Sequence, residues 1–387
     1  MDGYISYRKR MQIIAIISIV LAVILDSSMY FLLSGYNRRE QEKREELHKL
    51  DIEKYEELKE NDVFYGEDIT DKDRELLDKM KNYDFYQKLE ERLDTYVGFF
   101  GTEAVRKTKN DNNWVGQFFE AVRNKYSYAR GINSGSRGTD SLYGYISLNT
   151  SALQVFEYFD LVVVCYGAYD DPETFATYYD GFLRSVKNQN EKCEIYCIIE
   201  ANAEGYNENA ETVRQLCALY GGICIDMNEY FEKHGIDYSM TLNGIAPNAY
   251  GDIEYLNAVM DTIEENLESG RRVTRENRVN FSTTRNFDNY KFVSMSDMKK
   301  ISDTVYEFSS SGKMATLVYK ISSGGGNTKV YVNGKKVMTC DIRYGDSDEL
   351  GVILISSELG SMNRIRIETA SEDVALKIYG VALSGAK

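Results

Sequence analysis

Residues 97–105 read VGFFGTEAV, an apolar run that ends in a turn beginning at Gly101. Such a run predicts a buried strand, and a glycine lets the backbone leave a strand sharply. In open α/β sheets, sites are built beyond the carboxyl ends of the strands. We therefore expect the turn at Gly101, Thr102 and Glu103 to lie at the edge of the sheet where a site is built.

The region around this turn alternates apolar strand-like runs with helical stretches. The strand-like runs cover 96–100, 161–166, 194–200 and 222–226, and the helical stretches cover 114–125, 171–187, 207–220 and 251–267. Alternation of this kind predicts a parallel sheet with helices on both faces. We expect one α/β domain over residues 96–270.

Beyond residue 270 the pattern changes to short alternating runs rich in Val, Ile, Tyr and Thr, with no evident helix. The expected strands cover 278–283, 290–294, 304–308, 314–321, 328–332, 336–342, 352–356, 363–368 and 375–381. Asn333 and Gly334 separate two of them and form the pair that favours a two-residue hairpin. This pattern predicts an all-β accessory domain over 271–387, a sandwich or jelly roll.

The N-terminal part of the chain resembles neither domain. After a short tail over 1–12, residues 13–34 are almost continuously apolar and long enough to cross a bilayer as a helix. Arg8, Lys9 and Arg10 precede this span as in a signal sequence, but no small-residue cleavage site follows it, so we expect an uncleaved single-pass anchor. Positive charge flanks both ends, so it does not decide the orientation. A short tail before a large domain favours an extracellular domain.

Two features of this part are candidate contacts with other proteins. Asp26 interrupts the apolar span, and it either meets a membrane protein partner or lies near the membrane interface. Residues 35–95 are rich in Glu, Lys and Arg, which predicts a helical stalk and lead-in. The stalk is either a solvated spacer or a coiled-coil contact.

The composition limits the chemistry of the chain. Its 387 residues carry a formal net charge of −15, which argues against a nucleic-acid partner because such proteins usually present a basic face. A histidine-dependent mechanism has only two candidates, His48 and His234. The six cysteines match no zinc spacing, and we expect them as free thiols that pack like small apolar groups. We expect neither a metal nor a cofactor.

Four segments stand in the order of a known set of blocks. Residues 85–101 (FYQKLEERLDTYVGFFG) lead into Thr102 and Glu103. Further segments are 132–144 (INSGSRGTDSLYG), 159–172 (FDLVVVCYGAYDDP) and 243–251 (NGIAPNAYG). Together they resemble the blocks of the SGNH (GDSL-type) hydrolase superfamily. The resemblance implies a flavodoxin-like parallel sheet, and SGNH domains in this architecture are similar to those that act on acylated cell-surface polysaccharides.

The resemblance also implies which catalytic positions have changed. In the family, Ser is the nucleophile, Gly and Asn bind the oxyanion, and Asp and His supply the base. On this sequence the Ser position is Glu103, the Asn position Tyr169, the Asp position Asn243 and the His position Ala246, while Gly135 is retained.

Acyl transfer needs a hydroxyl nucleophile, a base and preorganised oxyanion donors. Glu103 has no hydroxyl, and Ala246 can neither take nor return a proton. Loss of a core triad member commonly costs about 10⁴–10⁶ in rate. We therefore predict no catalytic residue, and a residual polar pocket lined by Glu103, Gly135, Tyr169 and Asn243 that is either open to a ligand or closed by Tyr169.

Neighbouring groups offer few substitutes for the lost residues. His234 would need a loop shift to reach the turn, and Thr102, Ser134 and Ser136 have no visible base, so local hydrogen bonding is their expected role.

A carboxylate pair is the other substitute. Glu103 with Asp170 or Asp171 could act on a glycosidic bond. However, Asp171 before Pro172 is typical of a helix start, and Asp170 is often structural in the family, so we expect structural roles for both.

Three functions follow from these features. The first is a membrane-anchored extracellular pseudo-hydrolase that binds cell-envelope glycan or scaffolds a surface assembly. The β-domain would help to bind the glycan, and this role rests on an analogy of fold. The second is an active carbohydrate O-acyl esterase or acyltransferase with non-standard residues. The third is a purely structural subunit of a membrane complex. The changed catalytic positions favour the first.

Overall fold

The computed structural model describes residues 79, 82–106, 113–152, 159–273, 287, 289–321, 326–342 and 350–385. These residues belong to the second of two units, 1–78 and 79–387. The predicted anchor at 13–34, Asp26, His48 and the expected strand at 278–283 lie outside the described residues. Within the described part, no helix combines the length and the apolar character needed to cross a bilayer.

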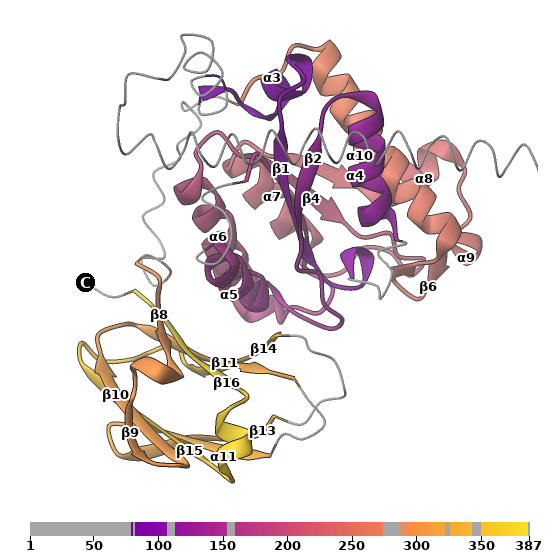
Figure 1. Ribbon diagram of the computed structural model, residues 1–387. Coiled ribbons are helices and arrows are strands. Elements are labelled where there is room, and N and C mark those ends of the chain that lie inside the picture. Colours follow the sequence, from indigo (N-terminus) through magenta and orange to yellow (C-terminus); the bar gives the residue numbers. More distant parts are fainter. Residues whose placement is uncertain are drawn as a thin grey trace, which may run out of the picture. The chain divides into compact units, whose positions relative to one another are not determined.

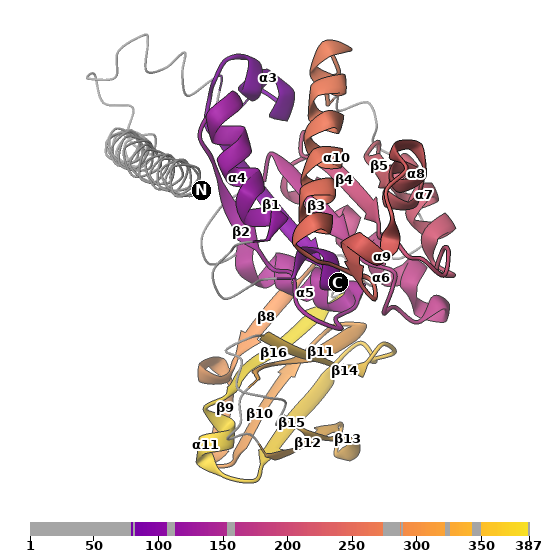
Figure 2. The same cartoon turned by 90° about the vertical axis from the view of Figure 1, so that its right-hand side faces the viewer.

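The N-terminal half of the described region is built on a five-stranded parallel sheet (Figures 1 and 2). Its strands are β1 (Thr95–Gly101), β2 (Ala129–Asn133), β3 (Leu161–Cys165), β4 (Glu194–Ile199) and β5 (Ile223–Asp226), in the order β2-β1-β3-β4-β5. The predicted parallel, flavodoxin-like sheet is therefore confirmed. The edge strand β2 is an addition, since its sequence ARGIN gave no apolar run.

Helices cover both faces of this sheet, and each face has its own core. One core packs α3 (Phe85–Glu90), α4 (Trp114–Lys125), α8 (Met227–His234) and α10 (Ala249–Glu268) against the sheet. The other packs α5 (Ser141–Ala152), α6 (Pro172–Gln189) and α7 (Ala210–Leu219). Successive side chains of β1 point to opposite faces of the sheet, so Phe99 packs in the first core and Phe100 packs in the second.

Helix α3, in the segment predicted as a lead-in, contributes to the first core. The Nζ atom of Lys88 donates to the Oδ1 atom of Asp160 over 2.7 Å, and the two side chains are only 1% and 4% exposed. The other oxygen of Asp160 accepts the backbone N–H of Tyr96 over 2.9 Å. Burial raises the pKa of Asp160 and the Lys88 charge opposes this rise. One buried ion pair thus joins the helix to the entry of β1.

The C-terminal part is a sandwich of two antiparallel sheets. One has the order β13-β12-β15-β10-β9 and the other the order β14-β11-β16-β8. The strands are β8 (Lys291–Ser294), β9 (Lys299–Ser302), β10 (Val305–Ser310), β11 (Met314–Lys320), β12 (Asn327–Val332), β13 (Lys335–Asp341), β14 (Leu350–Ser356), β15 (Asn363–Thr369) and β16 (Ile378–Ser384). Residues from both sheets share one core, which includes Leu317, Val330, Ile365 and Val381. The predicted β-sandwich is confirmed.

Local features of the sandwich also follow the sequence. Asn333 and Gly334 join β12 to β13 with φ angles of 52° and 80°, and Val332 pairs with Lys335, so the predicted two-residue hairpin is confirmed. Strand β9 and the short helix α11 (Glu372–Ala375) were not predicted. The sandwich packs on the α/β domain near α5, where the Tyr145 hydroxyl donates to the Phe287 carbonyl over 2.9 Å.

Lys88→Ala should destabilise the protein strongly, because it leaves Asp160 buried without its counter-charge. We expect the free energy of unfolding, measured by urea denaturation, to fall by about 3–5 kcal/mol. Lys233→Ala, at an exposed position on α8, is the control and should change it by less than about 1 kcal/mol. Equal losses in the two variants would show that the buried pair has no special role.

Candidate functional site

The turn after β1 lies where the strand order of the sheet changes direction. Sheet order runs from β1 to β2 on one side and from β1 to β3 on the other, and such switch points are the usual ligand positions of open α/β sheets. Gly101 pairs with Cys165 of β3, and the Thr102 N–H donates to the Cys165 carbonyl over 3.1 Å. A Cβ atom on Gly101 would lie 2.5 Å from that carbonyl, so the close approach requires glycine.

Glu103 occupies the centre of the site and is surrounded by polar side chains. It begins the 3₁₀ turn η1 (Glu103–Val105) and is only 9% exposed. The Arg137 Nε atom lies 3.2 Å from one carboxylate oxygen, and the Arg106 Nη1 atom lies 3.7 Å from the other. The Tyr169 hydroxyl donates to Glu103 over 3.4 Å. Two cations and a phenol therefore engage the group at the predicted nucleophile position.

Tyr169 does not fill the site as a buried plug. The residue is 47% exposed, while its hydroxyl donates to Glu103. Burial and the nearby negative charge of Glu103 raise the pKa of Tyr169, so its hydroxyl stays protonated as a donor. The arrangement offers an exposed aromatic ring beside a charged network.

Glu200, which follows β4, is a second carboxyl group at this edge and was missed by the sequence analysis. Its Oε1 atom accepts the Thr102 hydroxyl over 2.9 Å, and the side chain is buried. Burial raises the pKa of Glu200 to about 7, although hydrogen bonds from Thr102, Cys165 and the Ala104 N–H oppose the rise. The sequence signal that could have indicated Glu200 is a single charged residue directly after an apolar strand.

Gly135, the retained oxyanion position, has its backbone N–H already engaged. That N–H donates to the Asn133 side-chain oxygen over 2.8 Å. Gly135 also forms a bridge with Arg106, and a Cβ atom on it would lie 2.1 Å from the Val105 carbonyl. The glycine is therefore required for close packing, and its N–H is not available to an oxyanion in this arrangement.

Asp170 and Asp171 shape the loop between β3 and α6. Asp170 accepts the backbone N–H groups of Ser141 over 2.8 Å and Gly167 over 3.0 Å, and it also accepts the Ser141 hydroxyl. Burial raises the pKa of Asp170 to about 6. Asp171 caps α6 by accepting the Glu173 N–H over 2.9 Å. Both carboxylates have the structural roles expected of them, and neither contacts Glu103 in the interactions of the described residues.

The last block forms a small hairpin against the turn. Strands β6 (Leu242–Asn243) and β7 (Ala246–Pro247) pair Asn243 with Ala246, and β7 contacts η1. The predicted base position, Ala246, thus lies on a strand that contacts the turn beginning at Glu103, and its side chain is a methyl group. Asn243 is exposed, and Asn248 caps α10 by accepting the Tyr250 and Gly251 N–H groups.

The other candidate groups are engaged elsewhere. His234 is exposed at the end of α8, where its Nδ1 atom lies 2.8 Å from the Tyr230 carbonyl of the same helix. The N–H groups of Ser134 and Ser136 donate to the carbonyls of Phe99 and Gly101 and extend the pairing of β1 with β2. The six cysteines are free thiols. Within the described residues, no cluster of His, Cys, Asp or Glu is arranged to hold a metal ion.

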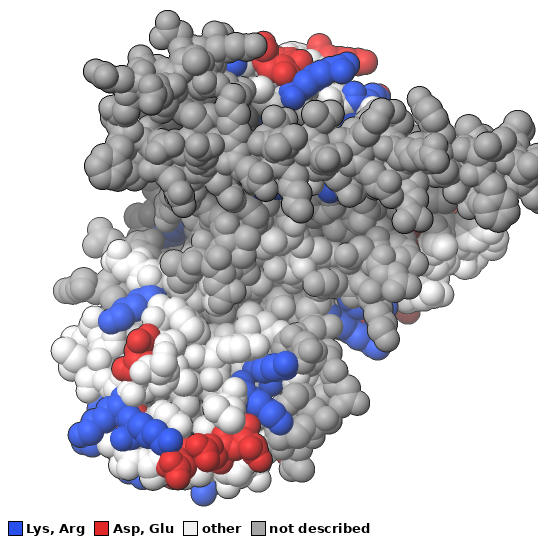
Figure 3. Space-filling model, viewed as in Figure 1, with Lys and Arg blue, Asp and Glu red and all other residues white. Residues whose placement is uncertain are grey.

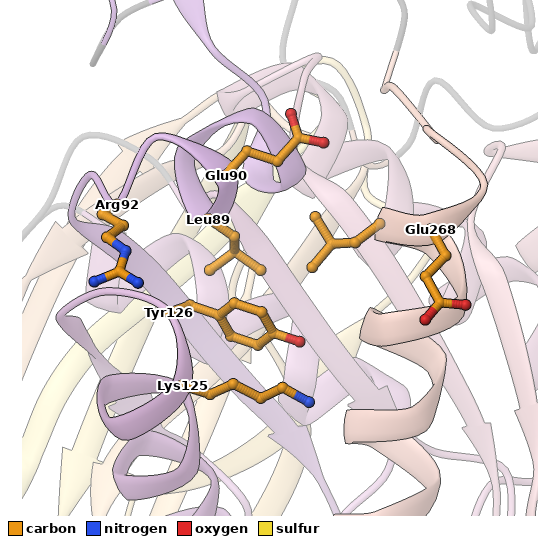
Figure 4. Close-up of a pocket in the computed structure, with 7 residues that line it drawn as sticks. Leu89, Glu90, Arg92, Lys125, Tyr126 and Glu268 are labelled. Carbon is orange, nitrogen blue, oxygen red and sulfur yellow. The ribbon is translucent and has the colours of Figure 1, made fainter.

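A separate groove lies at the opposite, amino-terminal edge of the sheet (Figure 4). It has a volume of about 400 Å³ and an apolar floor of Leu89, Tyr126 and Leu267 between α3, α4 and α10. Charged side chains at its rim belong to Glu90, Arg92, Lys125 and Glu268. None of the positions that the resemblance singled out lies in this groove, so it is not part of the site around Glu103.

No family model and no curated protein sequence matches the chain. Among solved structures, a two-domain esterase (CEX) active on acetylated mannans aligns over 81% of this chain and 95% of its own, with a TM-score of 0.56 and 15% identity. Such an esterase co-crystallised with mannopentaose aligns over 80% and 94%, with a TM-score of 0.55 and 14% identity. AlinE4, an SGNH-hydrolase family esterase, aligns over 45% and 97%, with a TM-score of 0.33 and 16% identity.

The chain therefore shares its fold with the two-domain esterase, and in both the match includes a parallel α/β domain of the kind described above. Because the alignments with the two-domain esterase cover four-fifths of the chain, the likeness extends through the β-sandwich as well.

The buried Glu200 should make stability depend on pH. Its pKa is higher in the folded state than its ordinary value of 4.5, so the folded state binds the proton more tightly than the unfolded state. The free energy of unfolding should therefore fall as pH rises from 4.5 to about 7. In Glu200→Gln the free energy of unfolding should fall by about 3 kcal/mol less over this pH range than in the wild type, since one pKa unit corresponds to about 1.4 kcal/mol.

Urea denaturation at several pH values measures this difference. Glu229→Gln, at an exposed position on α8, is the control and should give a pH profile parallel to that of the wild type. If the Glu200→Gln profile also runs parallel to the wild type, the proton on Glu200 has no part in stability.

Proposed function

We propose that this protein is a membrane-anchored, extracellular SGNH-like pseudo-hydrolase that binds cell-envelope glycan at the site around Glu103 without cleaving it. The single observation that carries the proposal is the engagement of Glu103 by Arg106, Arg137 and Tyr169 at the position of the family's nucleophile. A carboxylate engaged by two cations and a phenol differs from the activated hydroxyl that the family's reaction needs, and it supports a role in recognition.

The loss of catalytic groups at the other positions supports the absence of esterase activity. Ala246 beside the turn offers no base, and the Gly135 N–H is engaged with Asn133. The nearby Thr102 hydroxyl donates to the buried Glu200, whose pKa near 7 would make it a partial base, but the hydroxyl is itself buried behind the turn. Attack on an ester needs an accessible oxygen and an oxyanion site, and among the described residues neither Thr102 nor the Gly135 N–H meets this need.

The exposed ring of Tyr169 supports a carbohydrate as the ligand. Aromatic rings provide a large apolar face with a polar edge, and sugars present apolar C–H faces with polar rims. The similar two-domain esterases act on acetylated mannans, and one was co-crystallised with mannopentaose. In this proposal the protein binds the same class of ligand as such esterases but does not hydrolyse an ester.

The apolar span at 13–34 and the charged stalk at 35–95 support a location at the cell surface. An anchored domain on a stalk would hold the site at a distance from the membrane, where envelope polymers lie. In this proposal the protein retains or positions a polymer, and Asp26 or the stalk offers a contact for a membrane protein partner.

The wild-type chain should hydrolyse 4-nitrophenyl acetate and acetylated mannan no faster than buffer containing the same concentration of an unrelated protein. Glu103→Ala should leave this background unchanged, because no catalytic group is removed. The combined variant Glu103→Ser, Tyr169→Asn, Asn243→Asp and Ala246→His tests whether the fold still supports the family's chemistry. Turnover by the wild type that disappears in Glu103→Ala would contradict the proposal.

Tyr169→Ala should weaken binding of an oligosaccharide by about tenfold, which corresponds to about 1.4 kcal/mol, a typical value for a lost aromatic contact. The measurement is isothermal titration of the full chain with mannopentaose and with a panel of envelope oligosaccharides. Tyr379→Ala is the control, because this β16 side chain is similarly exposed at 45% but lies far from Glu103 in the sequence and in another domain. Equal affinities for the wild type and Tyr169→Ala would exclude the ring from the site.

A further inference from the structure

The outer face of the five-stranded sheet in the β-sandwich carries a row of side chains across all five strands. The register places Lys336 of β13 opposite Tyr331 of β12, which lies opposite Arg366 of β15. Arg366 lies opposite Glu307 of β10, which lies opposite Lys299 of β9. Side chains opposite one another in antiparallel strands lie on the same face.

Burial along β15 shows that this face is the outer one. Ile365 and Ile367 are fully buried in the sandwich core, whereas Arg364 and Arg366 are exposed. The row therefore faces solvent. Because neighbouring strands lie about 4.8 Å apart, the row spans about 19 Å, a length suited to a linear polymer.

The centre of the row is a fixed aromatic ring. The Tyr331 hydroxyl donates to the Glu368 Oε2 atom over 3.0 Å, and the Arg366 guanidinium lies 5.8 Å from the ring centroid. Arg366 also pairs with Glu368. These contacts restrain Tyr331, which reduces the entropy lost when a ligand packs on it.

The charges on this face are unlike those of the whole chain. Cationic side chains at Lys299, Lys329, Lys336, Arg364 and Arg366 outnumber the anionic ones at Glu307, Glu368 and Asp341, although the chain has a net charge of −15. The two arginines pair with Glu307 and Glu368. Lys299, Lys329 and Lys336 have no ion pair among the described residues. In Figure 3, basic and acidic side chains lie next to one another on the visible side of the sandwich.

From this row and its unpaired lysines we propose that the outer face of the sheet binds an anionic glycan, a polymer with uronate or phosphate groups, with Tyr331 under a sugar ring and the lysines on its charges. This inference rests on the proposed function and names the class of glycan and the surface that takes it. A glycan fits better than a nucleic acid, because the net negative charge of the chain repels a dense polyanion outside this one face.

The test uses the full chain with two defined probes, hexagalacturonate and neutral mannohexaose, in isothermal titration at low salt. We expect at least tenfold tighter binding of hexagalacturonate, and a loss of affinity as salt is raised. The double variant Lys329→Ala/Lys336→Ala and the single variant Tyr331→Ala should each weaken hexagalacturonate at least tenfold. Lys233→Ala/Lys291→Ala, at exposed lysines away from this face, is the matched control and should have no effect.

Unchanged thermal unfolding of each variant ensures that lost binding reflects the face and not the fold. Hexagalacturonate affinity that survives both face variants would overturn this inference, and so would equally tight binding of a single-stranded oligodeoxynucleotide. If mannohexaose binds and Tyr169→Ala removes it while the face variants have no effect, the proposed function stands and this inference fails. If neither probe binds, both fail.

Discussion

The parallel pairing of β1 with β3 is the constraint on which the site depends. It places Gly101 against Cys165 so closely that no side chain fits, and the chain must then turn away from the sheet. Glu103 after β1 and Tyr169 after β3 therefore emerge at the same edge, where the strand order changes direction. The buried contact between Thr102 and Glu200 extends this edge to β4. The corner of the sheet is fixed by backbone geometry, whichever side chains occupy it.

At the positions that the resemblance assigns to the catalytic groups, the side chains differ in chemistry from those of the family. A hydroxyl, a base and oxyanion donors would cooperate on a reacting ester. In their place, Glu103 is paired with cations, Ala246 is inert, and the Gly135 N–H is engaged within its own loop. The same groups make a polar surface with an exposed ring, which suits recognition. In the proposed function, this arrangement links the esterase-like fold to a binding role.

Much of this could be predicted from the sequence, for physical reasons. The helix over Trp114–Lys125 and the strands β1, β3, β4 and β5 follow from strong apolar patterns. Strand β2 was missed because it is polar, short and at the sheet edge, and α5 because burial on nearly all sides leaves its apolar residues without a single stripe. At the site, the order of the blocks predicts which positions correspond to the family's catalytic residues, and this assignment stays a prediction. Glu200, Arg106 and Arg137 were not predicted, because only the folded chain brings them to Glu103.

The central claim is that the corner around Glu103 no longer contains an activated hydroxyl. A fluorophosphonate probe reacts covalently with the activated serine of a working hydrolase, and intact-mass spectrometry detects the adduct. The wild-type protein should show no mass increase after incubation with excess probe, while an active SGNH esterase treated in parallel should be fully labelled. An adduct mapped by peptide sequencing to Thr102, Ser134 or Ser136 would contradict the account.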